Sequence, residues 1–519
     1  MSKDFRRAEL VMALDEAAQL RVAPYVSSLT DDVFALSGLP EEVIAVLFAY
    51  YSRSRDDLRT NLARLLADQD LDVGSSKGPP ALAFASEKAR AFHEKWVVGY
   101  GHASVAEHAV VHLALENVSI VASKVIEDLR LGSYTEKSTR YVVFDHQSFV
   151  EPPGLPPELS AKYRASNQNL FDVYLGLMPR VMDALRTAFP KPEKATEAGH
   201  AAAIRSQACD LLRGLLPAGT RTNLGLTANA RALEILLTKM LSNPLGEVQS
   251  LAQSMHGAAA HVAPTLVKYA ARSAHRSSLN ETVQDALKRV YTPPPAGASS
   301  TMVFSQPVRA VRFDKDALER VVLALAYEGG PPAAHALSLL DGIRQATRSE
   351  LATVLQAAFR HRGPHDQAPR GLEASSMTFE LMLDYGAYRD LQRHRMLSPA
   401  TQILSCDLGF QTPSELTDLG LADGYHDALI AAHDVAKLLQ ETHPFEAQYA
   451  VPLAYRIRTL WTLNLRELFH VIELRSARQG HQSYRRIAQG LYRAACAVHP
   501  WLSDLIRVDL EDYPLARPS

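Results

Sequence analysis

Cysteine is scarce in this chain, with three residues among 519. Cys209, Cys406 and Cys496 are far apart and show no metal-type spacing. A disulfide framework is therefore excluded, and the pattern is typical of a reducing cytoplasm. None of the three is an obvious nucleophile, so we expect chemistry that does not depend on a thiol.

Long apolar runs and a strong charge imbalance are also missing. No stretch of about 18 apolar residues occurs, and Met1 to Leu10 is charged, so we expect neither membrane insertion nor secretion. A net charge of −2 argues against a protein whose main role is to bind the phosphates of nucleic acid. It does not exclude binding of small anionic ligands. We predict a cytoplasmic, globular protein of two to four domains.

Proline marks the expected domain boundary. Pro293, Pro294 and Pro295 forbid helix, and the small residues after them allow a flexible joint. We therefore predict a first domain over residues 1–290, a linker over 291–300 and a second domain over 301–519.

Most of the chain has helical periodicity, as in Val43, Val46, Leu47 and Tyr50. Strand candidates are fewer and shorter. They are Val308 to Phe313, Tyr141 to Phe144, and Met377 to Leu383.

Two parts of the chain repeat one another. Asn229-Ala-Arg231 returns 235 residues later as Asn464-Leu-Arg466, and Pro217 returns as Pro452 at the same displacement. A second alignment, displaced by 265, pairs Ser133 with Ser398. An insertion near residues 152–192 in the first half absorbs the difference. We favour a duplicated module over chance similarity.

A basic tripeptide stands out in the second half. Arg393-His394-Arg395 places three cationic or titratable side chains in a row, and we expect them on a helix. A solvated helix face is the ordinary explanation for such a run. An anion-binding site is the alternative.

A second polar motif follows a glycine-containing loop in the first half. Ser138-Thr-Arg140 offers a hydroxyl and a forked guanidinium to one phosphate. Arg213, four residues before Pro217, is a third possible hydrogen-bond donor to the phosphate. An exposed polar turn and a helix C-terminal cation are the alternative explanations.

Histidines between Tyr100 and His112 raise the question of a metal. We expect this segment to open a helix, where His108 and His112 share one face. The order Glu-His-x-x-x-His is not that of zinc proteases, and no third ligand is evident. We therefore predict no metal and favour hydrogen-bonded structural histidines.

Taken in order, these segments resemble the flavin-dependent thymidylate synthases. That family has Arg-His-Arg followed after seven residues by Ser, usually within Ser-x-Arg-Tyr, here Ser138-Thr-Arg140-Tyr141. The resemblance implies FAD as cofactor, NADPH and methylenetetrahydrofolate as co-substrates, and methylation of dUMP to dTMP. It also implies an α+β fold, with two tandem domains that each hold a mainly antiparallel sheet flanked by helices, forming an internal pseudo-dimer. A homodimer of the duplicated chain is expected.

The resemblance also assigns residues. Arg475 would activate the pyrimidine by stabilising negative charge on its N3/O edge. The residues matched to dUMP binding are Glu136, Ser138, Arg140 and Arg213. Those matched to FAD are Arg393, His394, Arg395, His102, Asn229, Arg231, Asn464, Arg466 and His470.

Each half departs from the family pattern at different positions. The first half has Asp128-Leu129-Arg130 where the second has the basic tripeptide, and Ile403 replaces the signature serine in the second half. Gln448 stands opposite Arg213, and Met240 opposite Arg475. We therefore expect neither junction between the halves to be complete. A degenerate flavin- or nucleotide-binding relative without synthase activity is the alternative.

Overall fold

The computed structural model describes residues 14–51, 54, 56–67, 103–146, 148–292, 307–330 and 334–513. The chain divides into two compact units. The first comprises residues 1–116, 131–136 and 223–291, and the second comprises 117–130, 137–222 and 292–519. The second unit thus combines segments from both predicted domains. Most of the predicted linker lies outside the described residues, and the division at 291–300 stays a prediction.

The first unit contains a three-stranded sheet of order β1-β3-β2. Strand β2 pairs antiparallel with β3, with Ser133 opposite Thr227. An N-terminal group of short helices has a hydrophobic core of its own around Val22, Leu47 and Leu62. The elements are α2 (Glu16–Val22), η1 (Ala23–Tyr25), α3 (Glu41–Tyr51), α4 (Leu58–Ala67), η4 (Ala103–Glu107), β1 (Val110–Ser119), β2 (Gly132–Glu136), β3 (Arg221–Asn229), α9 (Ala230–Leu241), α10 (Gly246–Ala260) and α11 (Ala274–Leu287).

The second unit contains a four-stranded antiparallel sheet of order β4-β5-β7-β6. Its strands are β4 (Val308–Phe313), β5 (Ser376–Asp384), β6 (Ser398–Thr401) and β7 (Arg456–Asn464). Alternate residues of β5 and β7 are buried, as the period of two requires. The helices are α6 (Ile120–Ile126), α7 (Pro157–Ala188), α8 (Glu197–Leu212), η5 (Arg213–Leu215), α12 (Ala317–Gly329), α13 (Ala336–Gln345), α14 (Arg348–Phe359), η6 (Arg370–Ala374), α15 (Tyr385–Leu391), α16 (Ser414–Asp418), α17 (Ala422–Thr442), η7 (Glu446–Ala450), α18 (Leu465–Ser476), α19 (Gln482–Val498) and η8 (Pro500–Leu502).

The two sheets share one strand order. Strands β5, β7 and β6 are neighbours in the same sequence as β1, β3 and β2. Strands β5 and β6 stand about 265 residues after β1 and β2, and β7 stands 235 residues after β3, so the repeats found in the sequence fall on equivalent strands. The α+β class is confirmed.

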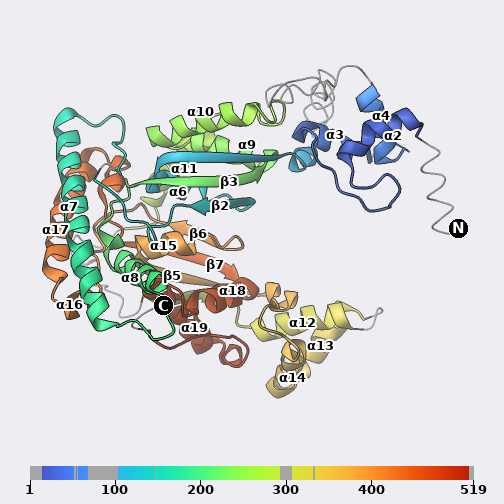
Figure 1. Ribbon diagram of the computed structural model, residues 1–519. Helices are drawn as coiled ribbons and strands as arrows, with labels where there is room; N and C mark the ends of the chain where they lie inside the picture. Colours follow the sequence, from blue (N-terminus) through green and yellow to red (C-terminus); the bar gives the residue numbers. More distant parts are fainter. Residues whose placement is uncertain are drawn as a thin grey trace. The chain divides into compact units, whose positions relative to one another are not determined.

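Within the second unit, a first-half segment and its second-half counterpart exchange backbone hydrogen bonds reciprocally. Ala218 N donates to Val451 O at 2.8 Å, and Leu453 N donates to Leu216 O at 2.9 Å. Pro217 and Pro452, which are 235 residues apart, form an antiparallel bridge between these bonds. Helices α7 and α17 pack along each other beside this contact (Figure 1). When each of two segments donates a backbone hydrogen bond to the other and accepts one in return, the pattern is that of a twofold interface.

One expected strand differs from the structure. The strand expected at Tyr141 to Phe144 is wrong, because Arg140 is held against α8 and the chain leaves the sheet after Glu136. In the second half, helix α18 begins at Leu465. Trp461 and Thr462 still belong to β7, and Asn464 caps the helix by accepting from Glu467 N at 2.8 Å.

Candidate active site

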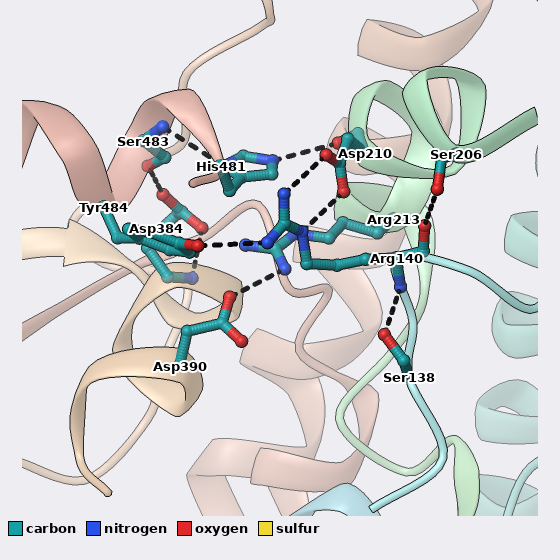
Figure 2. A network of polar contacts seen from close by, with 11 residues as sticks. Ser138, Arg140, Ser206, Asp210, Arg213, Asp384, Asp390, His481, Ser483 and Tyr484 are labelled. Carbon is teal, nitrogen blue, oxygen red and sulfur yellow. Dashed lines mark hydrogen bonds and ion pairs between the residues drawn. The ribbon is translucent and has the colours of Figure 1, made fainter. Parts of the chain in front are cut away.

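The Ser-x-Arg loop lies against α8 and α19 in the second unit. Arg140 is nearly buried, and its Nε and Nη2 donate to the two carboxylate oxygens of Asp210 at 2.8 Å each. Nη1 donates to Tyr484 Oη at 3.0 Å. Burial alone would lower the pKa of Arg140, but the hydrogen bonds and charge of Asp210 outweigh it and raise the pKa. The loop arginine is therefore a cation held by Asp210, and Figure 2 shows the two together.

Arg213 follows α8 and enters the same cluster. Its side chain is 4% exposed, and Nη1 donates to Asp390 at 3.0 Å. Among the described residues, Nη2 has no hydrogen-bond partner. Burial opposes ionisation of Asp390, yet the charges of Arg213 and Arg140 lower its pKa to about 2. An unsatisfied buried guanidinium nitrogen is costly, and an anionic ligand would satisfy it.

Arg475 and His394 form the next part of the site. Arg475 Nε donates to His394 Nε2 at 2.9 Å, so the ring proton lies on Nδ1, which faces Glu467 at 3.0 Å. Burial lowers the pKa of His394 although Glu467 opposes it, and the imidazole is neutral at pH 7. The Arg475 guanidinium carbon lies 5.6 Å from the centre of the Tyr484 ring.

The basic tripeptide is not on a helix, which corrects the expectation. Helix α15 ends at Leu391, and residues 393–395 form the turn before β6. Arg393 contacts Glu127 through Nη2 at 2.7 Å, whereas the side chain of Arg395 is exposed. His470 on α18 stacks edge-on against His394, with ring centres 5.2 Å apart. The helix end turns the three side chains in different directions.

Both Asn-x-Arg segments have structural partners. Asn229 and Asn464 are the N-caps of α9 and α18. Arg231 pairs with Glu107, and Arg466 donates to Glu373 at 2.7 Å. Arg466 also donates to Ala368 O and to Gln367.

Glu136 and His102 are the remaining predicted residues. Glu136 ends β2, opposite Leu224, and belongs with Asn229 and Arg231 to the first compact unit. His102 lies outside the described residues.

The helix expected after Tyr100 is wrong. Residues 103–107 form a single 3-10 turn, and His112 lies on β1, where it contacts Thr227 at 2.8 Å. His108 packs against Phe48 instead. The described part of the chain holds no cluster of three metal-ligating side chains. None of its helices has the length and apolar character needed to cross a membrane.

Several residues of the cluster were missed by the sequence analysis. His481 caps α19 by accepting from Ser483 N at 3.1 Å, and its other ring nitrogen lies 3.2 Å from Asp210 O. Ser483 donates to Asp384, which caps α15 (Figure 2). No local spacing in the sequence points to these residues, because Asp210 pairs with Arg140 and Asp390 pairs with Arg213 across distant segments.

A cavity of about 310 Å³ adjoins the cluster. This is the lower end of the range of small-molecule sites. Its polar lining includes Asp210, Arg213, Asp384, His481 and Ser483.

The structure changes the expected pairing of the halves. We expected neither junction to be complete, but Arg140 lies with Arg213, and Tyr484 links it to Arg475. The polar positions kept by the two halves are therefore complementary. Their counterparts all lack positive charge and are Ser405, Gln448, Met240 and Leu129.

Comparisons with known proteins agree with these motifs. The family described as "Thymidylate synthase complementing protein" matches residues 47–265 and 315–501. A UPF0159 protein of Chlamydia pneumoniae is 35% identical over 95% of this chain and 94% of its own length. A UPF0159 protein of Thermoplasma acidophilum is 31% identical over 82% of this chain and 90% of its own length.

Two further matches are more local. A flavin-dependent thymidylate synthase of Thermococcus kodakarensis is 40% identical over 15% of this chain and 35% of its own. A crystal structure of the flavin dependent thymidylate synthase ThyX from Helicobacter pylori, complexed with FAD and dUMP, covers 39% of this chain and 100% of that chain, with 17% identity and a TM-score of 0.29. From the two matched segments and the relatives aligned over nearly the whole length, the chain belongs to the Thy1 family of flavin-dependent thymidylate synthases.

Proposed function

We propose that this chain is a flavin-dependent thymidylate synthase with one catalytic site. It would convert dUMP to dTMP with methylenetetrahydrofolate and NADPH. The observation that carries the proposal is the cluster of Arg140, Arg213, Arg475 and His394, in which motif positions from both halves lie together.

The residues fit an anionic pyrimidine nucleotide. Arg213 has an unsatisfied buried nitrogen, and Arg140 keeps two of its five N–H donors free of the bonds to Asp210 and Tyr484. Ser138 on the same loop adds a hydroxyl. Arg475, supported by neutral His394, would stabilise negative charge on the uracil edge, which makes C5 electron-rich without a cysteine.

The cofactor would sit beside the basic turn. Arg393, Arg395, Asn464, Arg466 and His470 remain the proposed FAD contacts of the second unit. The first unit has its own proposed flavin-binding residues, His102, Asn229 and Arg231. When bound and reduced by NADPH, FAD would supply the hydride that completes the new methyl group. His394, neutral and hydrogen-bonded on both ring nitrogens, would hold Arg475 and its neighbours in place.

The same proposal includes an internal pseudo-dimer of two tandem domains. The reciprocal bonds around Pro217 and Pro452 support it, as does the shared strand order of the two sheets. Pairing of two duplicated chains into a homodimer is proposed as well, and light scattering of the purified protein tests it.

A degenerate relative that binds flavin or nucleotide without making dTMP is the second candidate. The observation in its favour is that Arg140 and Arg213 already have carboxylate partners in Asp210 and Asp390. These acids weaken the attraction of the site for a phosphate dianion.

Release of tritium from C5-labelled dUMP decides between the two. Purified protein should show flavin absorbance and release tritium only with NADPH and methylenetetrahydrofolate. Arg475→Ala should lose turnover and keep its flavin. Flavin binding without tritium release would favour the second candidate, and protein that cannot be reconstituted with FAD would contradict both.

A further inference from the structure

Tyr484 links the two ends of the proposed site. It lies in the first turn of α19 and is 6% exposed. Its hydroxyl accepts from Arg140 Nη1 at 3.0 Å. The guanidinium carbons of Arg140 and Arg475 lie 5.5 and 5.6 Å from the centre of its ring. One side chain thus contacts the loop arginine and the arginine assigned to the pyrimidine.

These contacts address an electrostatic difficulty. Two guanidinium groups near one another repel, and burial strengthens the repulsion. The negative faces of an aromatic ring attract cations, so a ring that both arginines approach offsets part of that cost. The hydroxyl also fixes the rotation of Arg140 about its bidentate pair with Asp210.

We propose that Tyr484 is a positioning residue that sets the spacing between Arg140 and Arg475, and with it the preference for a pyrimidine nucleoside monophosphate. The inference rests on the proposed function, in which Arg140 contacts the phosphate and Arg475 the uracil edge. The residue 235 positions earlier is Gln249. The aromatic side chain therefore occurs in the half that retains the pyrimidine arginine.

Two substitutions separate the roles of hydroxyl and ring. Tyr484→Phe removes the acceptor for Arg140 and should raise the KM for dUMP about tenfold, with kcat within about twofold. It should also reduce the preference for dUMP over deoxyuridine, which lacks the phosphate. Tyr484→Leu removes the ring as well and should in addition lower kcat about tenfold.

The control is Tyr455→Phe. That buried tyrosine also loses one hydrogen bond, from its hydroxyl to Leu429 O at 2.8 Å, outside the cluster. If the role of Tyr484 is purely structural, all three variants should change thermal stability. Their KM, kcat and preference for dUMP should then be the same as in the unsubstituted protein. That result, or equal kinetic constants for Tyr484→Phe and Tyr484→Leu, would overturn the proposal.

Failure of the proposed function is recognised in the unsubstituted protein. If it releases no tritium, calorimetric affinity for dUMP replaces the kinetic constants. A tenfold weaker affinity of Tyr484→Phe then still supports the positioning role, and equal affinities overturn it. Unsubstituted protein that binds no dUMP overturns both proposals.

Discussion

At the residue scale, the arginines of the site were predictable and their partners were not. Arg140, Arg213 and Arg475 follow from short motifs in the sequence. Asp210 is 70 residues from Arg140, and Asp390 is 177 residues from Arg213, so these pairs exist only because the fold brings the segments together. A motif shows which group is charged, but the tertiary structure determines what neutralises it.

Asp210 offers a direct test of the buried pair. Asp210→Asn leaves Arg140 with an uncompensated charge in a nearly buried position, so the free energy of unfolding should fall by about 3 kcal/mol. Urea denaturation measures this. Glu158→Gln, which breaks an exposed pair with Lys162, serves as control and should leave the denaturation midpoint unchanged. Equal effects of the two substitutions would contradict our account of Arg140.

His481 predicts a pH dependence of stability. Burial, followed by the charge of Arg213, lowers its pKa to about 4, and its Nδ1 accepts from Ser483 N, leaving no room for a second proton. The unfolded chain binds that proton below about pH 6.5. Stability is therefore fully present above pH 6.5 and falls as the pH drops towards 4, by about 3 kcal/mol.

The measurement compares unfolding free energies at pH 7 and pH 4.5. His481→Asn retains a capping side chain but has no titrating ring, so it should lose less stability over this window than the unsubstituted protein. An identical loss in both would show that the group does not titrate as we infer.

At the element scale, the alternation of apolar residues predicted strands well. The residues at which helices begin were not predicted well. Val308 to Phe313 is a strand with the predicted bounds, and Met377 to Leu383 lies within β5. The turn of residues 393–395 was mistaken for helix because charge patterning cannot distinguish a helix from the turn that ends it. His112 lies on a strand because alternate residues of β1, among them Val111, Leu113 and Leu115, are buried.

The contact between the repeated segments depends on a small residue, Gly219. A Cβ on Gly219 would lie 2.5 Å from Tyr163 Oη and 2.9 Å from Tyr449 O. Gly219→Ala should therefore destabilise the protein by about 1 to 3 kcal/mol, because the reciprocal bonds must shift.

Gly176 provides the matched control. It lies inside α7, and a Cβ there meets nothing within 4 Å, so Gly176→Ala should stabilise the helix by about 0.5 to 1 kcal/mol. Urea denaturation of both variants gives the comparison. A neutral Gly219→Ala would mean that the segments do not approach each other as closely as described.

At the scale of the whole molecule, the repeated motifs were visible in the sequence but the sorting of the polar residues was not. Sequence alone suggested that both sites were incomplete, because it could not show which half contributes to which site. In the structure, Arg140, Arg213, Arg475 and His394 belong to one cluster. The residues at the equivalent positions of the opposite half carry no positive charge and are Ser405, Gln448, Met240 and Leu129.

One site per chain should be visible in the flavin content. Saturated protein should hold about one FAD per chain, because the first half has Asp128-Leu129-Arg130 where the second has the basic tripeptide proposed to contact FAD. Flavin released by denaturation, divided by protein concentration, gives the ratio. A value near two would contradict the loss of the second site.

The reciprocal bridge at Pro217 and Pro452 has a consequence for behaviour in dilute solution. The segments around Pro217 and Pro452 belong to one polypeptide, so they meet by an intramolecular event, at an effective concentration that does not depend on the protein concentration. Mass action, which separates independent subunits at low concentration, cannot part these segments without unfolding the chain. Specific activity should accordingly hold constant down to concentrations at which an assembly of separate chains would fall apart.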